Sequence, residues 1–165
     1  METKFNSQIC TTKEQSERLL ALGLKKETAD MHLFRVRHKE YWSQWHPKTD
    51  PYSKLGFYAI RQNSVEYIPA WSLHRLMEMM PTLIYRRERQ YWLDINNDGV
   101  CYNTNGGFAC VEYIADNLYD NILYCIEWLI KEGYFNKEYL VNLTDTNAHQ
   151  DMVDSFRYAF EALKK

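Results

Sequence analysis

The fold of this chain depends on how one stretch is interpreted, YWLDINNDGVCYNTNGGF at residues 91–108. Its segment DINNDG at 94–99 matches the opening of a helix–loop–helix calcium loop, in which alternate oxygen side chains converge on the ion. Such a loop needs a glutamate at its twelfth position, where this sequence has Asn105. The residues before the loop alternate apolar and polar, which is typical of a strand. We therefore interpret the stretch as two β-hairpins and expect no metal site.

The dipeptide Asn105-Gly106 predicts the turn of the second hairpin. A type I′ turn requires positive φ at both central residues, which Asn and Gly tolerate best. A two-residue loop at this place sets Cys101 opposite Cys110 in a non-hydrogen-bonded pair, whose Cα atoms are about 4.5 Å apart. That separation lies within the range of a disulfide, so we expect the two thiols to be neighbours.

The first hairpin closes through a loop at residues 96–99, which pairs Leu93 with Tyr102. A further strand at 83–86 joins through a turn near Glu88-Arg89. These pairings predict an antiparallel four-stranded β-meander at about residues 82–114. One of its faces is apolar and needs a covering layer. The side chains on this apolar face are Leu93, Ile95, Val100, Tyr102, Ala109 and Val111.

Amphipathic segments with capping signals predict the helices that cover this meander. The segment TTKEQ at 11–15 offers overlapping capping boxes at a helix start, each formed by a Thr hydroxyl and a following Glu or Gln. Pro81 stops a second helix, and Gly133 closes a third. The whole chain is therefore expected to have an α+β fold. The expected covering helices lie at about 12–22, 70–80, 116–132 and 150–163.

The composition is that of one globular domain: 165 residues, 45% of them hydrophobic, with a formal charge of −2. We expect a single domain over residues 1–165, with a long aromatic-rich loop at about 38–56. No apolar run approaches the roughly 18 residues of a membrane span, and the N-terminus lacks the apolar segment of a secretion signal. We therefore expect a cytoplasmic protein that does not enter a membrane. Short strands are expected at about 30–37, 57–60 and 65–68.

The four cysteines and five histidines lack the paired short spacing of a zinc site. We interpret the cysteines as reduced, mostly buried thiols. The alternative is a small enzyme with a site near Cys101 and Cys110. Phosphate-binding loops, nucleophile elbows and paired metal-binding histidines are not found in the sequence, so we expect no cofactor and favour a non-enzymatic binding protein.

The loop at 38–56 provides a candidate partner-binding site made of Trp42, Trp45, His46 and Tyr52. Exposed aromatic side chains are common anchors at protein interfaces. The alternative is that these tryptophans fold back and form a small satellite core.

A second candidate site lies at 85–92, where Arg86, Arg87, Arg89 and Trp92 combine charge with an aromatic ring. Basic groups hold phosphates and rings stack on bases, so this segment is a candidate nucleic-acid-binding site. The alternative is a hairpin tip with solvated charges. Because the chain is near neutral overall, we expect a macromolecular partner that is a protein rather than a nucleic acid. The sequence leaves the target and the oligomeric state open.

A resemblance to a protein family rests on three segments, TTKEQSERLLALGL at 11–24 with its continuation to Met31, IPAWSL at 68–73, and IEWLIKEGYFNK at 126–137. Together they resemble an uncharacterised family of small proteins encoded by phages and mobile elements of anaerobic gut bacteria. That family has no known activity. The resemblance therefore implies a genomic setting, an accessory protein of a mobile element, and implies no catalytic residues.

Overall fold

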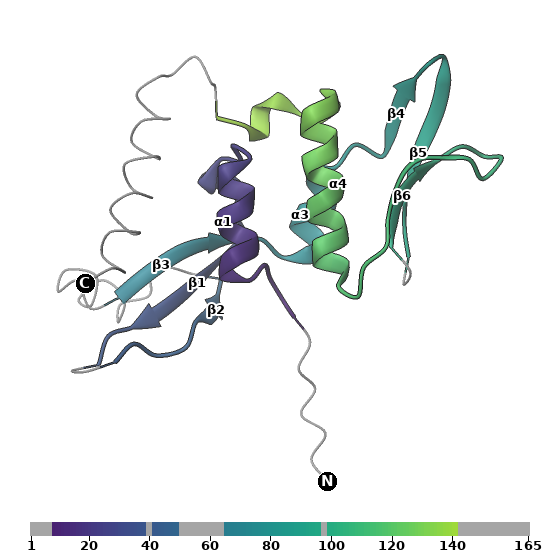
Figure 1. The fold of residues 1–165 in the computed structure, drawn as a ribbon. Coiled ribbons are helices and arrows are strands. Elements are labelled where there is room, and N and C mark those ends of the chain that lie inside the picture. The colour runs from purple at the N-terminus through teal and green to yellow at the C-terminus, as the bar shows by residue number, and fades with distance from the viewer. Residues whose placement is uncertain (1–7, 39–40, 50–64, 97–98, 142–165) are drawn as a thin grey trace, which may run out of the picture.

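The computed structural model describes residues 8–38, 41–49, 65–96 and 99–141. It has the expected α+β architecture, with a three-stranded and a four-stranded antiparallel sheet. In Figure 1 the helices stand between the two sheets, with the three-stranded sheet on the left and the four-stranded sheet on the right. No helix among the described residues is long and apolar enough to cross a membrane.

The four-stranded sheet is the predicted meander, with strand order β4-β5-β6-β7. Its first hairpin has the expected register, since Leu93 pairs with Tyr102. The turn between β4 and β5 consists of Arg87 and Glu88, whose φ angles of 50° and 64° are those of a type I′ turn. The strands are β4 (Leu83–Arg86), β5 (Arg89–Ile95), β6 (Val100–Asn103) and β7 (Ala109–Tyr113).

The second hairpin differs from the expected type I′ turn at Asn105-Gly106. The amide of Gly107 donates to the carbonyl of Thr104 (2.9 Å) and the amide of Thr104 donates to the carbonyl of Phe108 (3.0 Å). The residue with positive φ is Gly107, at 79°. The loop is therefore a three-residue turn that ends in a left-handed glycine. The second glycine, directly after Gly106, permits this turn.

This turn changes the pairing of β6 with β7, so the predicted pair of Cys101 with Cys110 is wrong. Cys101 pairs with Glu112, and the register shifts beside Asn103, which leaves Cys110 as the extra residue of a β-bulge. The bulge turns Cys110 toward the core, where it packs, while Ala109 is exposed instead of buried. The two thiols therefore belong to opposite faces of the sheet.

Helix α4 (Leu118–Glu132) covers the apolar face of the meander and contacts β6 and β7. The Asn117 side chain caps its first turn by accepting from the amide of Tyr119 at 2.8 Å, and Gly133 ends it with a φ of 79°. The prediction for 116–132 is confirmed. The core between α4 and the sheet includes Val100, Tyr102, Ile122, Leu123, Cys125, Ile126 and Leu129, all fully buried.

Two shorter helices complete the described layer, α1 (Lys13–Ala21) and α3 (Leu73–Met79). Thr12 and Gln15 form the predicted capping box of α1. The side chain of Ser72 caps α3 by accepting from the amide of Arg75 at 3.1 Å. These helices confirm the predictions at 12–22 and 70–80, whereas the prediction at 150–163 lies outside the described residues. Single 3-10 turns occur at Lys26–Thr28 and Lys137–Tyr139.

The three-stranded sheet consists of β1 (Met31–Val36), β2 (His46–Lys48) and β3 (Val65–Ala70), with β1 in the centre. Strand β2 lies within 38–56, so part of the predicted long loop is an edge strand. Residues 50–56 of that loop and the strand expected at 57–60 lie outside the described residues. Strand β3 is followed directly by Trp71, whose buried indole donates to the hydroxyl of Thr28 at 3.0 Å.

Candidate functional site

The face of the four-stranded sheet that points away from α4 is the candidate site, and we call it the outer face. Side chains alternate between the two faces along each strand, and the register fixes which of them are neighbours. The Trp92 and Tyr85 side chains on this face are 44% and 63% exposed. The outer face is formed by Leu83, Tyr85, Gln90, Trp92, Asp94, Cys101, Asn103, Glu112 and Ile114.

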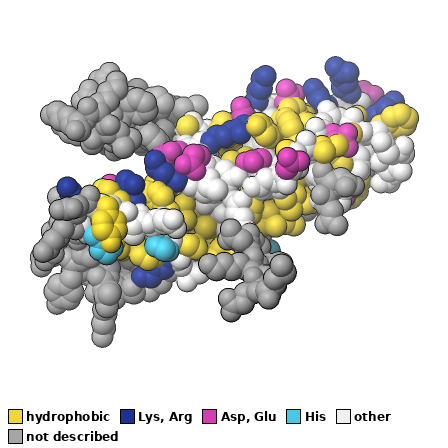
Figure 2. Space-filling model, turned by 60° about the horizontal axis from the view of Figure 1, so that its bottom comes forward, with side chains coloured by type: hydrophobic (Ala, Val, Ile, Leu, Met, Phe, Trp, Pro, Cys, Tyr) yellow, Lys and Arg dark blue, Asp and Glu magenta, His cyan; other side chains and the backbone are white. Residues whose placement is uncertain are grey.

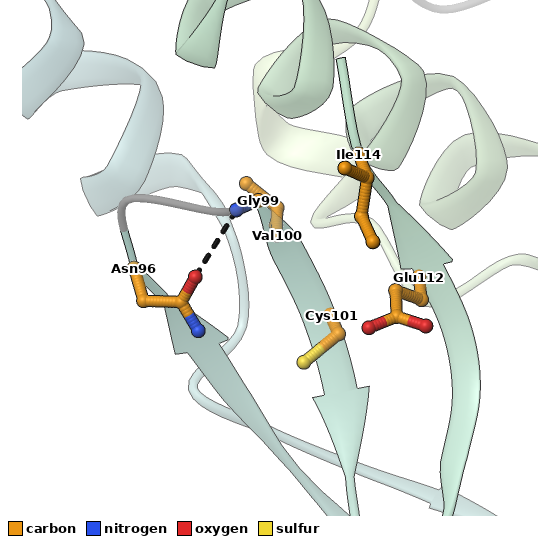
Figure 3. A pocket seen from close by; sticks show the side chains of 6 residues that line it. All are labelled: Asn96, Gly99, Val100, Cys101, Glu112 and Ile114. Carbon is orange, nitrogen blue, oxygen red and sulfur yellow. Dashed lines mark hydrogen bonds between the residues drawn. The ribbon is translucent and has the colours of Figure 1, made fainter. Parts of the chain in front are cut away.

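One end of the outer face contains a shallow hollow of about 440 Å³. It is lined by Asn96, Gly99, Val100, Cys101, Glu112 and Ile114. In Figure 3 the Cys101 thiol and the Glu112 carboxylate extend to the same side from neighbouring strands. The Asn96 side chain closes the hairpin loop beside this hollow, since its Oδ1 accepts from the amide of Gly99 at 3.1 Å.

The outer face is acidic as well as aromatic. Asp94, Cys101 and Glu112 form one row across β5, β6 and β7. The amide of Asn103 donates to Asp94 at 3.3 Å, and within the described parts of the chain neither Asp94 nor Glu112 forms an ion pair. The side chains of this face include no Lys, Arg or His.

The two cysteines near this face are poorly suited to nucleophilic chemistry. Burial, followed by the charge of Asp94, raises the pKa of the Cys101 thiol. Burial also raises the pKa of Cys110, although Arg86 opposes that shift. A reactive cysteine needs a lowered pKa, because the thiolate is the nucleophile. All four cysteines are free, and the residues that the structure describes contain no group of three ligands suited to a metal ion.

The candidate nucleic-acid site at 85–92 is divided between the two faces of the sheet. Arg86 points to the side of α4, where it pairs with Glu132 at 3.2 Å and lies 5.7 Å from the ring centre of Trp128. Trp92 lies on the outer face, and the exposed Arg87 and Arg89 are at or next to the turn. Figure 2 shows Lys and Arg side chains at the rim of the half that holds this sheet. The structure therefore does not bring the four residues together.

The tryptophans of the candidate partner site fold back onto the three-stranded sheet. The Arg35 guanidinium carbon lies 4.7 Å from the ring centre of Trp42 and 4.8 Å from that of Trp45. Trp45 also packs on a small buried cluster of Cys10, Met31, Leu33 and Ala70. Both rings are half-buried, as the satellite-core alternative expects.

The third residue of that site, His46, is exposed and lies on the opposite face of the sheet, 5.6 Å from the ring of Phe34. The fourth, Tyr52, lies outside the described residues.

The sequence analysis did not select the outer face as a candidate site, although a signal for it was present. Trp92 and Asp94 are two residues apart on a strand, so they share a face. Comparisons of the chain with protein-family models, with curated proteins and with solved structures give no match.

Proposed function

We propose that the chain is a non-enzymatic protein-binding module and that the outer face of the four-stranded sheet is its binding surface. The observation that carries this proposal is the exposure of Trp92, at 44%, in the interior of a regular sheet. Large aromatic residues placed near the centre of a surface are the commonest anchors of protein interfaces. Strands hold such anchors more rigidly than loops do.

Two further observations favour a protein over a nucleic acid. The carboxylates of Asp94 and Glu112 would repel phosphates on this face. The basic residue Arg86, which directly follows Tyr85 in the sequence, already forms an ion pair with Glu132. The resemblance to mobile-element proteins supports an accessory role, which in this proposal is carried out in the cytoplasm.

The loop tryptophans have less to offer a partner than the outer face. Trp42 and Trp45 are already in contact with Arg35, so binding through them would first have to break an intramolecular contact. Trp92 and Tyr85 need no such rearrangement, since both are exposed.

Affinity capture from the native host tests the proposal with three forms of the full chain: the unaltered protein, Trp92→Ala, and Tyr41→Ala as a control. Tyr41 is an aromatic residue that is 65% exposed and lies outside the four-stranded sheet. We expect a protein that co-purifies with the unaltered chain and with Tyr41→Ala, and that is lost from Trp92→Ala. A protein retained equally by all three forms would contradict the choice of surface.

A further inference from the structure

The described arginines of this protein repeatedly occur in one arrangement, an aromatic ring together with a carboxylate. Arg35 shows it most fully. Its guanidinium lies between the rings of Trp42 and Trp45, at 4.7 and 4.8 Å, while its Nε donates to the carboxylate of Glu66 at 2.6 Å. The ring face attracts the cation and the carboxylate pairs with its N–H groups, so each contact reinforces the other.

Three other arginines repeat the arrangement with partners from different parts of the chain. Arg18 lies 4.3 Å from the ring centre of Tyr124 and pairs with Glu127. Arg75 lies 5.7 Å from the ring centre of Tyr139 and pairs with the carboxylate of Glu78 at 3.2 Å. Arg86 lies 5.7 Å from the ring centre of Trp128 and pairs with the carboxylate of Glu132 at 3.2 Å.

The outer face has the ring and the carboxylate of this arrangement, but none of the arginines that the structure describes completes it. Trp92 and Asp94 lie on one face of β5, about 6.6 Å apart along the strand. Glu112 lies in the same row as Asp94 but two strands away, so the backbones of the two residues are about 9.6 Å apart across the sheet. Among the residues with described positions, no Lys or Arg lies over the Trp92 ring or pairs with either carboxylate.

We infer that the partner supplies this arginine: the outer face binds a protein segment with an exposed arginine that stacks on Trp92 and pairs with Asp94. The inference rests on the proposed function and adds the chemistry of the partner. Arginine fits better than lysine because its planar guanidinium stacks on a ring and donates two parallel hydrogen bonds to a carboxylate. Charge selects the occupant as well, since two carboxylates without a cation attract a basic segment and repel an acidic one.

A second copy of the chain is a poor occupant of this face. Packing two outer faces against each other would bring Asp94 and Glu112 of one copy close to the same carboxylates of the other. Like charges that face each other at an interface disfavour association. A separate basic partner avoids this repulsion.

A random 12-residue peptide library displayed on phage tests the inference, with selection on the full chain and subtraction on Trp92→Ala. We expect the Trp92-dependent peptides to be enriched in arginine. For the tightest synthetic peptide, replacing that arginine by citrulline, its neutral isostere, should weaken binding about tenfold or more. On Asp94→Asn the same replacement should have a much smaller effect, whereas on Tyr41→Ala it should keep its full effect.

The outcomes separate the two proposals. Trp92-dependent peptides without arginine would overturn the inference and leave the binding function standing. If neither peptides nor captured proteins depend on Trp92, the proposed function itself fails. A single-stranded DNA oligonucleotide that binds the full chain and is lost from Trp92→Ala would also overturn the inference, because an acidic ligand would then occupy the same face.

Discussion

Alanine substitutions at the two adjacent glycines of the second hairpin distinguish the observed turn from the one that the sequence predicts. In the observed loop Gly107 has a φ of 79°, whereas Gly106 does not have positive φ and a Cβ on it would lie 3.6 Å from Phe108, an ordinary contact. In a type I′ turn Asn105 and Gly106 would both need positive φ, and Gly107 would not. We therefore expect Gly107→Ala to be the more destabilising substitution.

The size of the difference follows from the backbone alone. An alanine in the left-handed region costs about 1–2 kcal/mol. Either substitution also restricts the unfolded chain and stabilises the protein by about 0.4–1 kcal/mol, but this contribution is common to both and cancels in the comparison. Gly106→Ala should thus be neutral or slightly stabilising, and Gly107→Ala less stable than it by about 1–2 kcal/mol.

Urea unfolding followed by far-UV circular dichroism measures this difference. With a slope of about 2 kcal/mol per molar urea, the two midpoints should differ by about 0.5–1 M. A larger loss in Gly106→Ala would refute the observed turn and restore the register in which Cys101 faces Cys110. Mild oxidation followed by mass spectrometry gives an independent check, since that register would form a 101–110 disulfide and the observed one should not.

Three more predictions concern the same half of the molecule. Gly99→Ala should lower the unfolding free energy by about 1–3 kcal/mol, since its Cβ would lie 2.2 Å from the Tyr113 carbonyl oxygen. If the variant is as stable as the unaltered chain, the close approach of these two residues is wrong. Burial raises the pKa of Cys125 from an ordinary 9.0 to about 12, so the contribution of Cys125 to stability should be fully present below pH 9 and be lost as pH rises toward 12, because only the unfolded chain then releases the proton. The slope should be shallower in Cys125→Ala by up to about 1.4 kcal/mol per pH unit. Asp94→Asn removes a charge that raises the pKa of Cys101, so it should lower that pKa and speed the alkylation of Cys101 in the folded protein at pH 8. Mass spectrometry of the peptide that contains Cys101, after digestion of the alkylated protein, measures the rate.

The features that the sequence predicts correctly depend on local chemistry. The capping box of Thr12 with Gln15, the Asn117 cap and the left-handed Gly133 are each determined by residues within a few positions of one another. The first hairpin likewise follows from its own loop and alternation, and the pair Leu93 and Tyr102 has the expected register.

The second hairpin was predicted wrongly because tertiary burial decides its register. The type I′ register would set Ala109 opposite Tyr102. The observed register sets Val111 there instead and places Tyr113 opposite Val100, against the core. Each additional buried methylene stabilises by about 0.8 kcal/mol, so exchanging alanine for larger side chains outweighs a local preference for one turn type. The bulge at Cys110 accommodates the change.

The difference between the candidate sites predicted from the sequence and the surface proposed from the structure also depends on tertiary contacts. At 85–92 the sequence interpretation treated Arg86 and Trp92 as one basic and aromatic surface, but strand alternation separates them, and Arg86 is taken up by Glu132, which lies 46 positions further along the chain. In the loop, Arg35 contacts the rings of Trp42 and Trp45. Where an arginine already lies on an aromatic ring, as Arg35 does on Trp42 and Trp45, a partner that binds the ring has to displace that contact. Such contacts are not evident from the local sequence, and they are the reason why we propose Trp92, rather than the tryptophans of the loop, as the residue that a partner binds.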